Sequence, residues 1–149
     1  MSETPPGALR LERTFQAPAH RVFAAWTKAE VLRRWWHAEH DWETPHAEVD
    51  PRVGGVIRAT MRNPHDGSQY GGGGTFTVLE PPHRLAFTWT WDDDGDEQLI
   101  EVEFHENEGA TTVILTNRGI DDAERDDYQE GWQDSFDNLA QALAGWCLW

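Results

Sequence analysis

One feature constrains the fold of this chain more than any other: apolar and polar residues alternate from about residue 42 to residue 117. The alternating segments are separated by hairpin-length turns, for example NPHDG at residues 63–67. Period-two alternation predicts strands that bury one face, and short turns join such strands in antiparallel pairs. The sequence therefore predicts a curved antiparallel sheet of about six to seven strands.

Two short helices are predicted before the main run of strands. A first strand is expected over residues 9–15, where apolar and polar side chains alternate. Pro18 follows, and proline is favoured in the first turn of a helix. Val22 and Trp26 then recur at helical spacing, and residues 28–36 show a second helical pattern. The predicted order is strand, two short helices, sheet.

A long amphipathic helix is predicted at the C-terminal end. Its apolar stripe has spacings of four, four, three and four, and the helix is expected to end at Gly145. The stripe consists of Tyr128, Trp132, Phe136, Leu139 and Leu143. A helix of this kind covers the apolar face of a sheet, which gives an α+β fold. If the sheet wraps around the helix, a pocket forms between them.

The chain contains nine tryptophans in 149 residues. Each buries roughly 150–250 Å², which corresponds to about 4–6 kcal/mol before opposing terms. A small domain does not need this many large rings to fill its core, so a cavity and a solid aromatic core both remain open. The expected cavity lining is Trp26, Trp35, Met61, Phe76, Trp89, Tyr128, Trp132, Phe136 and Leu139. Tyr128 adds a hydroxyl group that is able to orient a ligand.

Composition and charge limit the kinds of partner and the cellular compartment that we expect for this protein. We expect one domain over residues 9–145, preceded by a disordered lead-in (1–8) and followed by an apolar tail (146–149). The net charge of −15 disfavours nucleic acid and anionic membrane surfaces as partners. The single cysteine excludes an internal disulfide, and no apolar run reaches the roughly 20 residues of a membrane helix. A cytoplasmic location is expected.

Candidate reactive groups are few. His37, His40 and His46 form the best metal-site candidate, but their spacing matches neither zincin motif, so surface histidines are the favoured interpretation. The glycine run at residues 71–74 lacks the Lys-Ser/Thr of a phosphate-binding loop, and a bent strand explains it better. We therefore expect no metal, no cofactor and no catalytic residue.

Several motifs in order resemble START-like, helix-grip proteins, and in particular the family of homologs of the heat-shock-chaperone ATPase activator. The resemblance covers roughly residues 9–144. The motifs are FQAP (15–18), VFAAW (22–26), LRRWW (32–36), DPRVGG (50–55), GTFTVLEPPHRL (74–85), LAFTW (85–89), TTVILTNRG (111–119) and GW (131–132) with Leu139.

The resemblance implies a helix-grip fold with a cavity for a hydrophobic or aromatic small molecule. Eukaryotic chaperone activators join this domain to a separate N-terminal domain that has no counterpart in this sequence, which argues against ATPase activation. The converging aromatic faces motivate the leading hypothesis, ligand binding without catalysis. One alternative is a cyclase- or hydrolase-like enzyme that places a polar pair in the cavity. Another is a chaperone-linked or self-associating protein that uses Trp36, Trp42, Trp146 and Trp149. Either a monomer or a homodimer is compatible with the sequence.

Overall fold

The computed structural model describes residues 8–37, 41–93 and 96–145. Strand β1 (Ala8–Phe15) is followed by helices α1 (Ala19–Thr27) and α2 (Ala29–Trp35). Pro18 holds the N-cap position of α1 with extended backbone. Both helices bury their predicted apolar side chains, so the two short helices expected after the first strand are confirmed.

Six further strands complete a single seven-stranded sheet. They are β2 (Glu43–Val49), β3 (Val56–Arg62), β4 (Gln69–Glu80), β5 (Arg84–Trp91), β6 (Gln98–Asn107) and β7 (Ala110–Arg118). Every neighbouring pair is antiparallel, and the order across the sheet is β1-β7-β6-β5-β4-β3-β2. The predicted antiparallel sheet is therefore confirmed, with the first strand added beside the last.

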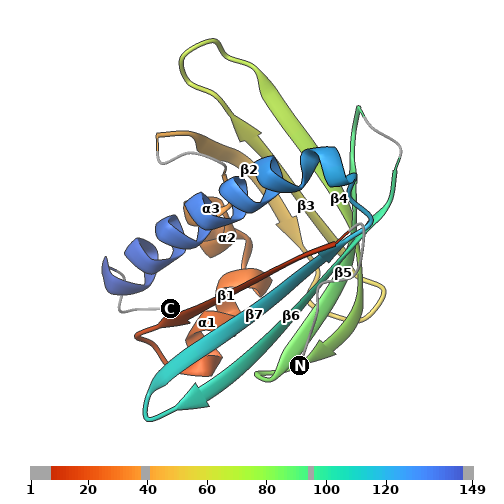
Figure 1. Cartoon of the computed structure of the whole chain (residues 1–149). Helices are drawn as coiled ribbons and strands as arrows, with labels where there is room; N and C mark the ends of the chain where they lie inside the picture. Colours follow the sequence, from red (N-terminus) through yellow and green to blue (C-terminus); the bar gives the residue numbers. More distant parts are fainter. Residues whose placement is uncertain (1–7, 38–40, 94–95, 146–149) are drawn as a thin grey trace.

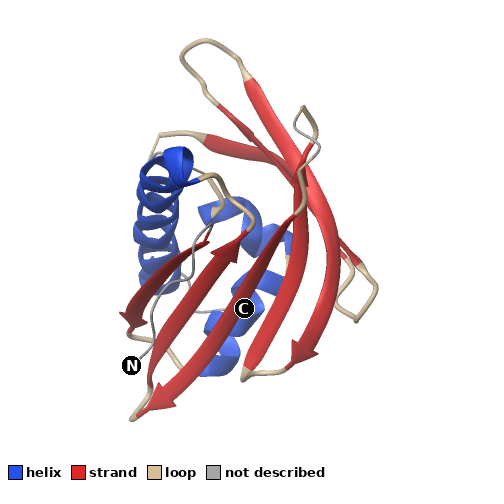
Figure 2. Ribbon diagram, turned by 45° about the vertical axis from the view of Figure 1, so that its right-hand side comes forward, coloured by secondary structure: helices blue, strands red, loops and turns tan. Residues whose placement is uncertain are grey.

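A short 3-10 turn, η1 (Asp122–Glu124), leads from β7 into the long helix α3 (Arg125–Gly145). Figure 1 shows α3 crossing the open side of the curved sheet, and Figure 2 shows all three helices on that same concave side. This arrangement is the α+β fold that the pattern predicted and the helix-grip architecture that the resemblance implied. It puts the aromatic stripe of α3 opposite the inner faces of β5, β6 and β7.

An aromatic cluster centred on Trp26 forms the core between sheet and helices. Trp26 is fully buried, and its ring centroid lies 4.7 Å from that of Trp35 and 6.0 Å from that of Trp132. Phe87 of β5 and Phe136 of α3 lie 6.3 and 6.4 Å from it. Centroid distances of 4.5–7 Å in tilted or edge-on geometry are the favoured aromatic arrangements, so this half of the interior is solidly packed.

The glycine run lies inside β4, in regular register with β3, and the register irregularity of β4 falls further along, between Phe76 and Val78. One of these glycines is required by a close approach. A Cβ at Gly72 would lie 2.8 Å from Cε2 of Trp89, closer than non-bonded carbons pack. Glycine there lets the indole of Trp89 lie directly against the β4 backbone.

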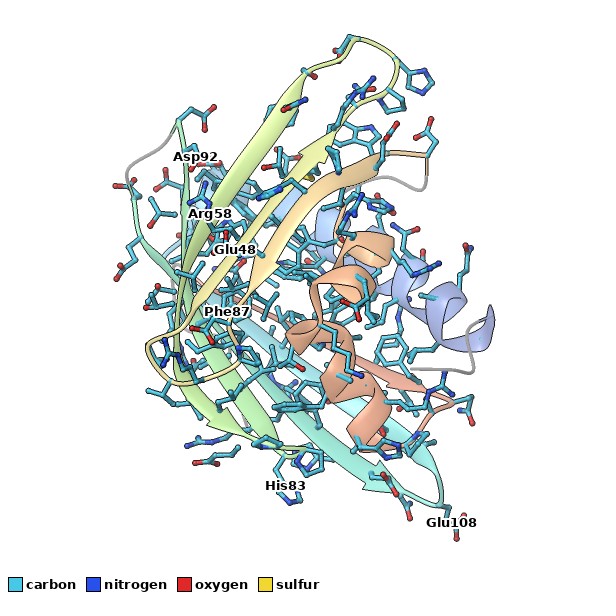
Figure 3. The ribbon with its side chains drawn as sticks, turned by 180° about the vertical axis from the view of Figure 1, so that it is seen from behind. Glu48, Arg58, His83, Phe87, Asp92 and Glu108 are labelled. Atoms are coloured by element: carbon cyan, nitrogen blue, oxygen red, sulfur yellow. The ribbon has the colours of Figure 1, made fainter. Side chains whose placement is uncertain are left out.

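The outer face of the sheet is charged. Arg58 alternates with the buried Ile57 and Ala59 along β3, so its side chain lies on the face away from the helices. Its guanidinium donates to Asp92 (Nη2–Oδ1 3.2 Å), and Figure 3 shows these two labelled side chains near Glu48. Exposed ion pairs of this kind contribute only about 0.2–1 kcal/mol each, so the aromatic interior dominates stability.

The expected domain limits differ slightly from the structure. Ala8, expected in the lead-in, belongs to β1, where it is buried against β7. The rest of the lead-in and the apolar tail, residues 146–149, lie outside the described residues. None of the helices in the described part of the chain has the length and apolar character that a membrane span requires.

Candidate functional site

A cavity of about 210 Å³ lies between the inner face of the sheet and the first half of α3. Its surface is mostly apolar. Asp127 is solvent-exposed, so the cavity meets the solvent at that end of the helix. The lining residues are Trp36, His37, Met61, Trp89, Trp91, Gln98, Ile100, Asn117, Asp127, Tyr128, Gly131, Trp132 and Ser135.

Four indole rings make up the apolar wall. Trp36, which directly follows α2, lies centrally, with its ring centroid 5.0 Å from that of Trp89 and 5.2 Å from that of Trp132. Trp89 in turn contacts Trp91 edge-on at 5.4 Å. The rings come from β5, α3 and the end of α2, so the wall forms only when sheet and helices assemble.

A chain of hydrogen bonds makes up the polar wall. Trp132 Nε1 donates to Asn117 Oδ1 (3.0 Å), and Asn117 Nδ2 donates to Gln98 Oε1 (3.0 Å). Gln98 Nε2 and Trp91 Nε1 both donate to the hydroxyl oxygen of Tyr128, at 2.8 and 3.1 Å. We call these five side chains the Tyr128 network. They come from β5, β6, β7 and α3.

His37 and Ser135 hold the third side of the cavity through structural hydrogen bonds. The Ser135 hydroxyl donates to the His37 carbonyl (2.8 Å), which ties α3 to the segment after α2. His37 Nδ1 lies 3.1 Å from Thr44 Oγ1, and Thr44 donates its own proton to the Trp36 carbonyl. Thr44 therefore accepts from His37, which places a proton on Nδ1.

Four of the nine residues predicted to line the cavity do line it. They are Met61, Trp89, Tyr128 and Trp132. They share the half of the molecule where β3, β5 and the start of α3 approach one another. The prediction of a cavity between sheet and long helix thus agrees with their placement, at a volume below the about 300–1,000 Å³ typical of ligand pockets.

The other five predicted residues lie in the packed core and not on the cavity wall. They are Trp26, Trp35, Phe76, Phe136 and Leu139, each at most 1% exposed. Neighbouring rings enclose them: Phe136, for example, packs edge-on to Phe15 at 5.6 Å. Periodicity identified which side chains face inward, but it does not distinguish a filled region from a hollow one along the same helix.

The prediction omitted most of the polar wall. Gln98 lies in phase with the buried Ile100, Val102 and Phe104 of β6, and Asn117 lies in phase with the buried side chains of β7. A polar residue at an inward-facing strand position was the available signal. Gly131 was a second available signal of the cavity lining, because it is a glycine within the predicted helix, three residues after Tyr128 and within the aromatic stripe.

The metal-site candidate is not assembled among the described residues, where no group of three potential ligands occurs. His37 is buried and His46 is exposed on β2, while His40 lies outside the described residues. The Ser68 hydroxyl and backbone N–H donate to Asp66 and lower the pKa of that carboxyl below its usual range. Asp66 belongs to the exposed β3–β4 turn, outside the cavity lining.

The placement of individual side chains also bears on the two alternative hypotheses. The enzyme hypothesis predicts a buried polar pair in the cavity, for example Tyr128 with a histidine or a carboxylate. The hydrogen-bond partners of Tyr128 are an amide and an indole. The interaction hypothesis requires an exposed Trp36, but this side chain is only 6% exposed and lines the cavity. Trp42 stacks on Tyr70 at 5.7 Å. Trp146 and Trp149 lie outside the described residues.

A long C-terminal helix held in the grip of a curved antiparallel sheet, with a cavity between them, defines the START-like helix-grip class. Within that class the family is also established. The profile of the family described as Activator of Hsp90 ATPase homolog 1-like protein matches residues 16–144. The chain therefore belongs to that family, which confirms the resemblance drawn from its motifs.

Solved structures agree with this assignment. The AHSA1 protein from Silicibacter pomeroyi is 34% identical, with a TM-score of 0.80 over 92% of this chain and 97% of that one. An AHSA1-like protein from Aeromonas hydrophila is 28% identical (TM-score 0.79, 93% and 92% covered). A Chromobacterium violaceum protein is 26% identical (TM-score 0.83, 91% and 96% covered). Among curated proteins, none matches the sequence significantly.

Proposed function

We propose that this protein binds one small, largely apolar molecule, aromatic in character, in the cavity between sheet and helix α3. The observation that carries the proposal is a hollow of about 210 Å³ beside a core that is otherwise solidly packed with rings. Proteins fill their interiors densely and leave few voids larger than a water molecule. A hollow walled by four indoles therefore favours a ligand site over a packing defect.

The volume limits the size of the ligand. An apolar cavity of about 150 Å³ holds benzene, so about 210 Å³ accommodates one to two fused rings. Flat indole walls favour a flat partner, because stacked and edge-on aromatic pairs contribute roughly 0.5–1.5 kcal/mol beyond the burial of area. We therefore propose a ligand of bicyclic size, smaller than a lipid or a polycyclic polyketide.

Calorimetric titration with indane, a bicyclic hydrocarbon, tests the proposal. We expect saturable one-to-one binding with a Kd below about 1 mM, which corresponds to about −4 kcal/mol. A cavity-filling variant supplies the contrast. A Cβ added at Gly131 would meet no atom within 4 Å, and Gly131 lines the cavity, so the side chain of Gly131→Leu has room to enter it.

Gly131→Leu is expected to abolish indane binding without loss of stability, since glycine inside a helix costs about 0.5–1 kcal/mol relative to alanine. Gln133→Leu is the matched control, because Gln133 is exposed on the same helix, and it should bind indane as the unmodified protein does. Absence of saturable binding in the unmodified protein, or equal binding by Gly131→Leu, would contradict the proposal.

A further inference from the structure

Each hydrogen bond of the Tyr128 network can run in only one direction, because an indole N–H stands at each end of the network. An indole N–H can only donate a hydrogen bond. Trp132 donates to Asn117, so the atom of Asn117 that faces Trp132 must be the amide oxygen. The amide nitrogen of Asn117 therefore faces Gln98, and the atom of Gln98 that receives its proton must again be the oxygen. The chemistry of the indole thus determines both amide orientations.

The same reasoning also fixes the role of the Tyr128 hydroxyl. Because the oxygen of Gln98 is occupied by Asn117, its nitrogen donates to the Tyr128 hydroxyl. Trp91, the indole at the other end, also donates to that oxygen. The phenolic oxygen therefore accepts two hydrogen bonds, and its single proton remains to be donated. None of the described residues accepts it. Tyr128 is half-buried and lines the cavity, and its O–H group is thus held as a donor.

A second donor, on a residue of the cavity lining, lacks an acceptor. The indole N–H of Trp89 is buried, with no hydrogen-bond partner among the described residues, and Trp89 lines the cavity at 1% exposure. A buried donor without a partner costs about 1–3 kcal/mol. The Trp89 nitrogen is itself buried, and the edge of the ring that carries it packs against β4 at Gly72. The Tyr128 hydroxyl is therefore the donor we consider for a ligand in the cavity.

We propose that the Tyr128 hydroxyl donates a hydrogen bond to the ligand, so the cavity selects a neutral one- or two-ring aromatic compound that carries an acceptor oxygen, such as an aromatic ketone. This inference rests on the proposed ligand-binding function. An anionic acceptor is disfavoured, because the exposed Asp127 is one of the lining residues and the chain carries a net charge of −15. Tyr128 is therefore a specificity-determining residue.

The Tyr128 proton has one competing destination. Gln98 and Tyr128 also line a polar hollow of about 30 Å³ beside Asp121 and Glu124, which has room for about one water molecule. A water there would accept the proton in place of a ligand. In that case the acceptor on the ligand would bring no advantage, and comparing two ligands that differ only in that acceptor separates the two destinations.

The test compares 1-indanone with indane by calorimetry in the unmodified protein, in Tyr128→Phe and in Tyr70→Phe. Tyr70 is the only other tyrosine and is 43% exposed outside the cavity, so it controls for loss of a phenolic hydroxyl. In Tyr128→Phe we expect the affinity for 1-indanone to fall about 3- to 10-fold, whereas the affinity for indane changes less than about 2-fold. Tyr70→Phe should leave both affinities unchanged.

Tyr128→Phe also removes the acceptor of Gln98 and Trp91, which affects both ligands alike, so the ratio of the two affinities isolates the bond to the ligand. An equal change for both ligands would overturn the inference while leaving the proposed function intact. If neither ligand binds the unmodified protein, the proposed function fails, and this inference fails with it.

A second measurement does not depend on how well the variant folds. The carbonyl stretching band of 1-indanone bound to the unmodified protein should lie at lower frequency than the band of 1-indanone in a hydrocarbon solvent, because hydrogen bonding weakens the C=O bond. A bound band at the hydrocarbon-solvent frequency would overturn the inference directly. Loss of the shift in Tyr128→Phe would assign the donor to Tyr128 and not to Trp89.

Discussion

Asn117 occupies an inward-facing position of β7 where the pattern of Val113 and Leu115 would call for another apolar side chain. Its amide is only 1% exposed and bonds to both Trp132 and Gln98. Buried polar groups are costly unless they are satisfied, so this residue is tolerated because it joins α3 to the sheet through the polar wall. At this position a polar residue replaces the apolar one that the alternation predicts, because the polar wall of the cavity needs its hydrogen bonds.

Asn117→Ala tests that role. The substitution leaves the Trp132 N–H and the Gln98 carbonyl oxygen without partners, and each unsatisfied buried group costs about 1–3 kcal/mol. We expect the free energy of unfolding in urea to fall by roughly 2–4 kcal/mol. Asn107→Ala, at an exposed strand end, should change it by less than about 0.5 kcal/mol. Equal effects of the two substitutions would contradict the role assigned to Asn117.

The polar wall also shows the limit of prediction at the residue scale. Trp89 and Trp132 were predicted to line the cavity from their type and phase alone, because large rings at inward positions are easily recognised. Gln98 and Asn117 were missed because a polar residue in an otherwise apolar face has no assigned partner in the sequence. Their partners lie on other strands and on α3, and only the assembled fold brings them together.

At the scale of single elements, β4 and β5 pack closely because Gly72 of β4 has no side chain. The Trp89 indole lies against the β4 backbone at Gly72, where a Cβ would meet the ring at 2.8 Å. At neighbouring Gly71, a Cβ would meet only the ends of the Asp92 and Thr60 side chains, which can move aside. The two glycines are therefore not equivalent.

Gly72→Ala should destabilise the protein by about 1–3 kcal/mol, the usual cost of overpacking a core, and should weaken indane binding by shifting the Trp89 ring. Gly71→Ala should be neutral or slightly stabilising, since alanine in a strand interior gains about 0.5–1 kcal/mol over glycine. Thermal unfolding of both variants provides the comparison. A destabilisation by Gly71→Ala as large as that by Gly72→Ala would refute this account of β4.

The secondary elements themselves were largely predictable. Period-two segments gave the strands, and the stripe from Tyr128 to Leu143 gave α3, which ends at Gly145 as expected. The start of the helix is less regular: a 3-10 turn precedes it, and the Asp121 side chain at the N-cap of that turn makes no capping bond. Long periodic runs identify elements reliably, whereas their ends depend on individual hydrogen bonds.

At the scale of the whole molecule, the interior divides into a filled half and a hollow half. Around Trp26 the rings pack at favoured distances, whereas about 210 Å³ remains open beside Trp89 and Trp132. Because the hollow half meets the solvent near Asp127, water can fill it, and it does not carry the full cost of an empty buried void. The hollow half is where we propose that the ligand binds.

The division between filled and hollow halves was the part of the fold that the sequence did not predict. Trp26 and Trp89 have the same side chain and both face inward, yet one is enclosed by rings from α2, α3 and β5, and the other borders the cavity. The difference depends on which side chains of other elements surround each ring, and no local pattern encodes those partners.

The most direct test of the central claim is a crystal structure of the protein grown in the presence of indane. We expect electron density for one indane molecule between the Trp89 and Trp132 rings, with Tyr128 at one end of the cavity. The Gly131→Leu variant under the same conditions should show the leucine side chain in that space and no ligand. A cavity closed by side chains in the unmodified protein, or indane bound only on the outer surface, would contradict the account.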